Sequence, residues 1–320
     1  MISRSYVLRA FVESPWAILP STLAVLDEIV TRHVYGEKLE AEEIQARIGG
    51  GSSRPTGRRV HNVAILPLFG TIVGRGNMMT DVSGASSAER FAADFDALVK
   101  DPEIGAIVID VDSPGGQVRG IEELARQIYD ARGSKPIVSI ANHSMASAAY
   151  WIGSAADEIV VTPSGEVGSI GVLGVHRDIS GAEARDGVKT TVISQGKYKT
   201  EANQFEPLSE EARAALQARI DEIYEQFVEA VARNRGVEIE TVRSGFGEGR
   251  MVSARKAVEM GMADRVDTLN GTLSRLLGTS EFATKTIRAE NLENQVASSA
   301  PLSDLAHQAK RLRDYVQIHK

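Results

Sequence analysis

The sequence contains no cysteine, which excludes disulfide bonds, thiolate metal ligands and a cysteine nucleophile. Basic residues are also in the minority, because 36 Lys and Arg stand against 43 Asp and Glu in 320 residues. The resulting net charge of −7 argues against a nucleic-acid-binding protein, whose contact surface is usually basic. The absence of cysteine is compatible with a cytoplasmic protein.

Long apolar segments are scarce as well. The N-terminus carries Arg4 and Arg9 and no extended apolar run, so no secretory signal is expected. The longest uncharged run, residues 136–156, is long enough to cross a bilayer, but it contains Asn142, His143 and four serines. We interpret this run as a buried strand, a turn and a buried helix, and we expect no membrane anchor.

The remaining composition is that of an ordinary soluble globular protein, with 42% hydrophobic and 25% charged residues. Shifts in composition suggest four parts. They are a helical N-terminal segment (1–48), a glycine-rich basic linker (49–59), a main domain (60–270) and a polar tail (271–320). Further short helices are predicted at 40–48 and from Ser303 onward.

Strands and helices alternate along the main domain, which predicts an α/β fold with right-handed βαβ crossovers. The unbroken apolar run AIVIDV at 106–111 is typical of a buried parallel strand. The predicted strands are 63–73, 106–111, 137–141, 159–162 and 190–194. The predicted helices are one capped by Ser21, one around 91–99, one around 121–128, then 209–235 and 253–260.

Three predicted strands end in runs of small residues: DSPGG at 112–116, HSMASAAYW at 143–151 and GSIGV at 168–172. Ligands of open α/β sheets bind at such strand ends. Adjacent glycines allow a sharp turn whose N–H groups can hold an anion or a developing oxyanion. Ser147, at a strand-to-helix turn, can present its hydroxyl to a cleft. None of the runs is a Walker or a complete G-x-G-x-x-G motif, so no nucleotide, cofactor or metal is predicted.

A serine nucleophile needs a base. His143 and His176 stand near these runs, but no Asp–His pairing is apparent. The remaining candidates are Lys197 and Lys199, which follow the last predicted strand. A lysine acts as a base at neutral pH only when burial lowers its pKa from about 10.4, and a drop of about three units costs roughly 4 kcal/mol. The sequence therefore calls for a closed apolar site around the lysine.

Together these motifs resemble the signal peptide peptidase A superfamily of serine peptidases. The resemblance covers roughly residues 60–270 and includes, in order, DSPGG (112–116), MASAAYWI (145–152), GSIGV (168–172), GKYK (196–199) and GRMVS (249–253). The N-terminal runs LRAF (8–11) and PWAI (15–18) further resemble the phage head-maturation protease branch. The fold implied is the crotonase/Clp-protease-like superfold of repeated ββα units, with a helical N-terminal extension.

The resemblance also implies a role for each matching residue. Ser147 matches the nucleophile and Lys199 the general base of a Ser–Lys dyad. Ser169 matches the hydroxyl that orients the lysine. The Gly116 N–H matches the main oxyanion donor, and the Ala148 N–H is a second donor.

The implied function is a serine endopeptidase that processes capsid or scaffold proteins during phage or prophage head assembly. It would act on polypeptides without a cofactor, as a homo-oligomer whose subunits share the active site, in the bacterial host cytoplasm or the phage prohead. Many members have two glycines after the nucleophile, whereas Ala148 and Ala149 stand here, so substrate preference does not carry over. Three alternatives remain open: a signal-peptide-degrading peptidase, an acyl-CoA enzyme on the same superfold, and a catalytically idle shell component.

Overall fold

The computed structural model describes residues 14–34, 57–76 and 85–278. The chain divides into two compact units, residues 1–269 and 270–320. Helix α11 (Leu269–Leu276) begins at this division and buries Thr272 and Leu273. The predicted helices at 40–48 and from Ser303 lie outside the described residues.

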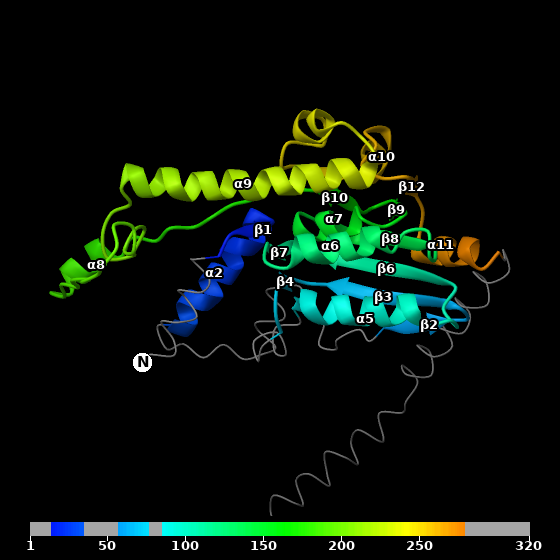
Figure 1. The fold of residues 1–320 in the computed structure, drawn as a ribbon, viewed down its shortest axis with the longest axis horizontal. Helices are drawn as coiled ribbons and strands as arrows, with labels where there is room; N and C mark the ends of the chain where they lie inside the picture. The colour runs from blue at the N-terminus through cyan, green and yellow to red at the C-terminus, as the bar shows by residue number, and fades with distance from the viewer. Residues whose placement is uncertain (1–13, 35–56, 77–84, 279–320) are drawn as a thin grey trace, which may run out of the picture. The chain divides into compact units, whose positions relative to one another are not determined.

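A sheet of eight strands forms the centre of the first unit (Figure 1). Its strands are β2 (Arg58–Val60), β3 (Val63–Phe69), β6 (Ala106–Ser113), β8 (Ile137–Ala146), β9 (Glu158–Val161), β10 (Glu166–Gly168), β11 (Met251–Ser253) and β12 (Arg265–Val266). The main path runs β11-β10-β8-β6-β3-β2, and β9 joins β8 to β12. Because β3, β6 and β8 are parallel, and β9 and β10 are both parallel to β8, the predicted α/β class is confirmed.

A smaller sheet of four strands lies at the carboxyl end of β6. It contains β1 (Trp16–Ile18), β4 (Ile72–Val73), β5 (Ser86–Ser87) and β7 (Gly115–Gln117), in the order β1-β7-β4-β5. The N-terminal segment therefore contributes a strand, β1, which pairs antiparallel with β7. The helix that follows, α2 (Pro20–Val34), begins at Pro20, one residue before the predicted cap.

Helices α5 (Ala88–Lys100), α6 (Ile121–Asp130) and α7 (Ala148–Gly153) cover one face of the central strands (Figure 1). The remaining helices are α8 (Ser180–Arg185), α9 (Glu210–Arg235), the π-helical turn η1 (Thr241–Gly245) and α10 (Ala254–Glu259). Phe91 and Phe95 of α5 are buried, as their helical spacing predicts. The Trp151 ring of α7 stacks on Phe227 of α9, with ring centroids 4.5 Å apart. This contact anchors the second half of α9 to the core.

Two predicted strands differ from the structure. The run 63–73 is broken at Gly70, whose φ of 66° turns the chain from β3 into β4. The strand predicted at 190–194 is wrong, because these residues have no regular structure and are exposed. Their apolar, β-branched composition favours a strand, but a strand also needs a neighbour to pair with. Arg58 and Arg59, expected at the end of the linker, instead pair with β3.

The uncharged run 136–156 contains all of β8 and all of α7, as predicted. Among the residues that the structure describes, no helix is both long and apolar enough to span a membrane.

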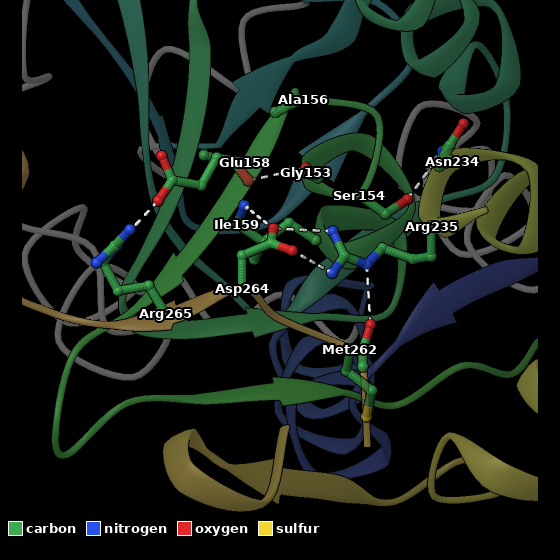
Figure 2. A network of polar contacts seen from close by, with 12 residues as sticks. Gly153, Ser154, Ala156, Glu158, Ile159, Asn234, Arg235, Met262, Asp264 and Arg265 are labelled. Carbon is green, nitrogen blue, oxygen red and sulfur yellow. Dashed lines mark hydrogen bonds and ion pairs between the residues drawn. The ribbon is translucent and has the colours of Figure 1, made fainter. Parts of the chain in front are cut away.

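A polar network supports the far end of α7 (Figure 2). The Asp264 carboxylate accepts hydrogen bonds from the Arg235 guanidinium at 2.7 and 2.9 Å and from the Ile159 N–H at 2.7 Å. Burial alone would raise the pKa of Asp264, but these hydrogen bonds and the Arg235 charge hold it below its usual value. Asn234 donates to the Ser154 hydroxyl at 2.9 Å, which fixes the end of α7.

Candidate active site

The structure brings the three small-residue runs together at one edge of the sheet. In the parallel pair β8–β10, Ala146 lies opposite Gly168, so Ser147 and Ser169 follow at adjacent strand ends. The Ser147 N–H donates to the Gly168 carbonyl at 2.7 Å. On the other side, Met145 of β8 lies opposite Ser113 of β6, at the start of the DSPGG run. Carboxyl ends of parallel strands share one edge, and this is where the sequence predicted a site.

Ser147 lies in a strained turn between β8 and α7. Its φ of 54° and ψ of −116° lie outside the regions that a non-glycine residue normally adopts. The residue is buried, and its hydroxyl is 3.4 Å from the Gly171 carbonyl oxygen. Its own carbonyl accepts the Trp151 N–H at 2.9 Å, which begins α7. A serine in a strained strand-to-helix turn is typical of a nucleophile, and such strain clusters at active sites.

Of the two glycines of β7, Gly115 lies directly against this turn. Gly115 has a φ of 96°, and a Cβ atom at this position would lie 3.0 Å from the Ser147 Cβ and 2.2 Å from the Ala17 carbonyl oxygen. A Cβ atom at Gly116 would lie 1.9 Å from the Ile72 carbonyl oxygen. Only glycine fits either position, so the β7 backbone can approach Ser147 at Gly115 and β4 at Gly116.

Ser169 and Ala148 also belong to this cluster of residues. Ser169 is 5% exposed, has a φ of 54° and donates its N–H to the Arg250 carbonyl at 2.9 Å. Ala148 is the first residue of α7 and is fully buried. The structure therefore places Ser147, Ala148 and Ser169 at adjacent strand ends, with Gly116 next to Gly115, the β7 residue that packs against Ser147.

Lys199 is not part of that group in the single chain. Residues 184–199 are all exposed, so the described residues by themselves do not form the closed apolar site expected around the lysine. Lys197 bonds to the Tyr198 hydroxyl at 2.7 Å and to the Glu211 carboxylate at 3.1 Å. These two contacts raise the pKa of Lys197, so less of it is in the neutral form that can accept a proton at neutral pH.

The two histidines near the runs, His143 and His176, contact residues other than Ser147. His143 has a side chain that is 73% exposed, and its Nδ1 lies 3.5 Å from the Asp112 carboxylate. His176 places its Nε2 3.2 Å from the Asn203 carbonyl oxygen. Within residues 14–34, 57–76 and 85–278, no group of three or more His, Asp or Glu side chains could hold a metal ion.

Sequence reasoning missed the position of β1 beside the nucleophile. Residues 16–18 appeared only within the PWAI run of a family resemblance, and three residues are too few to show a strand's alternation. The strand is fully buried, with Trp16 4%, Ala17 0% and Ile18 2% exposed. The unusual density of apolar residues in so short a run was the one available signal.

Comparison with known proteins identifies the family. The model of Peptidase family S49 matches residues 130–281. The head-tail preconnector protein GP5 of Enterobacteria phage P21 is 32% identical over 254 residues, which are 79% of this chain and 50% of that protein. The capsid assembly protease C of Escherichia phage lambda is 29% identical over 295 residues, which are 86% of this chain and 67% of that protein.

A cellular relative matches more weakly. Protease 4 of Salmonella typhi is 28% identical over 214 residues, which are 67% of this chain and 34% of that protein. The chain thus spans half the length of GP5 and a third of Protease 4. The matched region contains Ser147, Ser169 and Lys199. The sequence resemblance is therefore confirmed, and the chain belongs to peptidase family S49.

Proposed function

We propose that this chain is a serine endopeptidase in which Ser147 attacks the peptide carbonyl and Lys199 of a neighbouring copy is the general base. The observation that carries the proposal is the strained turn at Ser147, packed against Gly115 of β7 where three strand ends meet. Ser147 is fully buried, has a strained backbone conformation, and lies beside a strand that can come this close only because it has glycine there. This arrangement has no evident structural purpose.

The chemistry follows from this arrangement. The Ser147 hydroxyl gives its proton to the neutral amine of Lys199 as its oxygen bonds to the peptide carbonyl carbon. The tetrahedral oxyanion accepts hydrogen bonds from the Gly116 and Ala148 N–H groups. Collapse expels the amine product, which takes the proton back from the lysine, and water then hydrolyses the acyl-enzyme by the same route. Ser169 orients the lysine.

A second copy of the chain would supply the lysine and the burial that it needs. Large exposed apolar side chains gather on the segment that carries Lys199, namely Val188 (52%), Val192 (47%), Ile193 (94%) and Tyr198 (55%). Between Glu210 and Glu222 of the adjoining α9, only Ala212 is buried. Contiguous exposed apolar surface marks an interaction site, and burying an ammonium favours its neutral form. The proposed enzyme is therefore a homo-oligomer with shared sites.

The substrate class follows from the relatives. Two of them are named for capsid assembly and for the head-tail preconnector, so we infer capsid or scaffold polypeptides as substrates of this chain. The site of action would be the host cytoplasm or the prohead. The paired sheets and the crossover helices also support the crotonase/Clp-protease-like superfold of repeated ββα units.

Labelling with a fluorophosphonate probe tests the proposal, because the probe reacts only with an activated serine. The wild-type protein is expected to be labelled at Ser147, while Ser147→Ala and Lys199→Ala lose both labelling and peptidase activity. Lys197→Ala is the matched control, since this lysine lies two residues away, and it should retain both. Absence of labelling from every form of the protein, or equal labelling of Ser147→Ala, would overturn the assignment. Incubation with the neighbouring structural proteins and mapping of new termini would then identify the cleavage sites.

A further inference from the structure

The N-terminal strand β1 has both of its backbone edges paired. On one edge it pairs antiparallel with β7, with Trp16, Ala17 and Ile18 opposite Gln117, Gly116 and Gly115. On the other edge, Trp16 and Leu173 exchange two N–H to carbonyl hydrogen bonds of 2.9 Å. The strand thus fills a slot, one chain wide, between β7 and the segment that follows Gly171.

This slot adjoins the nucleophile. A Cβ atom at Gly115 would lie 2.2 Å from the Ala17 carbonyl oxygen and 3.0 Å from the Ser147 Cβ. The Ala17 carbonyl and the Ser147 side chain therefore lie on opposite sides of a single small gap. The space between these two groups is too small for another segment of the chain.

The register also aligns β1 with the proposed oxyanion donor. The Leu19 N–H donates to the Pro114 carbonyl at 2.9 Å, and the Val118 N–H donates to the Pro15 carbonyl at 3.4 Å. Hydrogen-bonded pairs alternate along an antiparallel ladder, so the pair midway between these two is also a hydrogen-bonding pair. That pair is Ala17 and Gly116. The Ala17 backbone therefore faces the residue that would bind a substrate's carbonyl oxygen.

We propose that β1 occupies the slot in which the peptide substrate binds, and that the chain in this conformation is autoinhibited. A peptide bound as an added strand takes its affinity from main-chain hydrogen bonds. Here both edges that could offer such bonds are already used by β1. Substrate can enter only when the N-terminal segment leaves the slot. This inference rests on the proposed function, because it concerns the regulation of the same site.

Side chains of α2 hold the segment in place. Trp16 and Ile18 pack with Leu23 and Val30 of α2 in a small apolar cluster, against Leu173 and Val175. The Arg177 guanidinium bonds to the Asp27 carboxylate and, at 3.0 Å, to the Thr31 hydroxyl. We call this set of contacts to residues 173–177 the α2 clamp. Release of β1 requires the α2 clamp to open.

A reversible disulfide tests the inference in the full-length chain. Trp16 and Gln117 are opposed in a non-hydrogen-bonded pair, where Cα atoms lie about 4.5 Å apart, within the range of a disulfide. Because the chain has no cysteine, Trp16→Cys with Gln117→Cys can form only this bond within one chain. The oxidised protein should lose peptidase activity and probe labelling of Ser147, and reduction should restore both. The single variants under the same oxidant are the controls.

Loosening the α2 clamp should have the opposite effect. Asp27→Ala removes the partner of Arg177 and should raise activity by about twofold to fivefold, the range for a partly exposed ion pair. Glu28→Ala is the matched control, because Glu28 pairs with Arg32 of the same helix, at 3.7 Å. It should leave the activity unchanged.

The outcomes separate the two proposals. Equal labelling of the oxidised and reduced double variant, or failure of the disulfide to form, would overturn autoinhibition and leave the proposed function standing. So would equal activity of Asp27→Ala and Glu28→Ala. Absence of labelling in the wild type at any state of the N-terminal segment would instead overturn the proposed function.

Discussion

Gly116→Ala would place a methyl group inside the pairing of β4 with β7. The new Cβ would lie 1.9 Å from the Ile72 carbonyl oxygen and 2.6 Å from the Ile72 carbonyl carbon and nitrogen. Ordinary contacts of a Cβ atom begin at 3.4 Å, so the two strands must separate by roughly 1.5 Å. The atoms in the way belong to backbone, which cannot move aside as a flexible side chain can.

Two effects of different size are expected from this substitution. Overpacking in a dense interior costs about 1–3 kcal/mol, and the backbone clash puts Gly116→Ala at the upper end, about 3 kcal/mol. Displacement of β7 also moves the N–H of Gly116, the proposed oxyanion donor, and loss of one such donor lowers the rate by about 10²–10³-fold. The loss of activity should therefore be much larger than the fraction of unfolded protein explains.

Urea denaturation and the rate of probe labelling measure the two effects separately. Gly245→Ala is the matched control, because its Cβ would meet only the Thr241 methyl at 3.7 Å and its φ is unstrained. It should keep the wild-type midpoint and labelling rate. A Gly116→Ala protein with both values unchanged would refute the close approach of β4 and β7. Lowered stability with an unchanged labelling rate would refute the role of Gly116 as oxyanion donor.

Three further predictions concern stability and assembly. Asp264→Asn should lower the free energy of unfolding by about 1–2 kcal/mol at neutral pH, allowing for partial exposure. The pKa of Asp264 in the folded protein lies below its usual value, so this stabilisation is present above the unfolded-state pKa and is lost as the pH falls through the folded-state pKa. In acid, the variant and the wild type should therefore have the same free energy of unfolding. Ile193→Asp should shift sedimentation toward monomer and reduce activity. The control Ile239→Asp should do neither, because Ile239 is also exposed (42%) but lies outside the segment that carries Lys199. Dilution of the wild type should lower the activity per chain at neutral pH, because a neighbouring copy would no longer supply Lys199 to the site. A fully active monomer at neutral pH would contradict the shared site.

Part of the fold and site could be predicted from local patterns. The run 106–111 has the continuous apolar character of a strand buried on both faces, and it forms the central β6. The helical spacing of Phe91 and Phe95 likewise identified α5. Once the strands were expected to be parallel, their small-residue ends had to meet at one edge, which located Ser147 and Ser169 together.

Other features depended on contacts between distant segments. The run 190–194 has strand-like residues, yet it is exposed because none of the strands in the described part of the chain pairs with it. Strand β1 carries too few residues for a pattern, and it exists because β7 and Leu173, far along the chain, pair with it on both sides.

The sequence by itself indicated the α/β class and, through the resemblance of its short motifs, the family, and it predicted which residues form the site, since periodicity and short motifs are local properties of the chain. Only the tertiary structure decided that Ser147 is held in a strained turn, that β1 fills the slot beside it, and that Lys199 is left exposed. The physical reason is that strain, close backbone approach and burial arise from packing between segments, and packing depends on the positions of all the neighbours together.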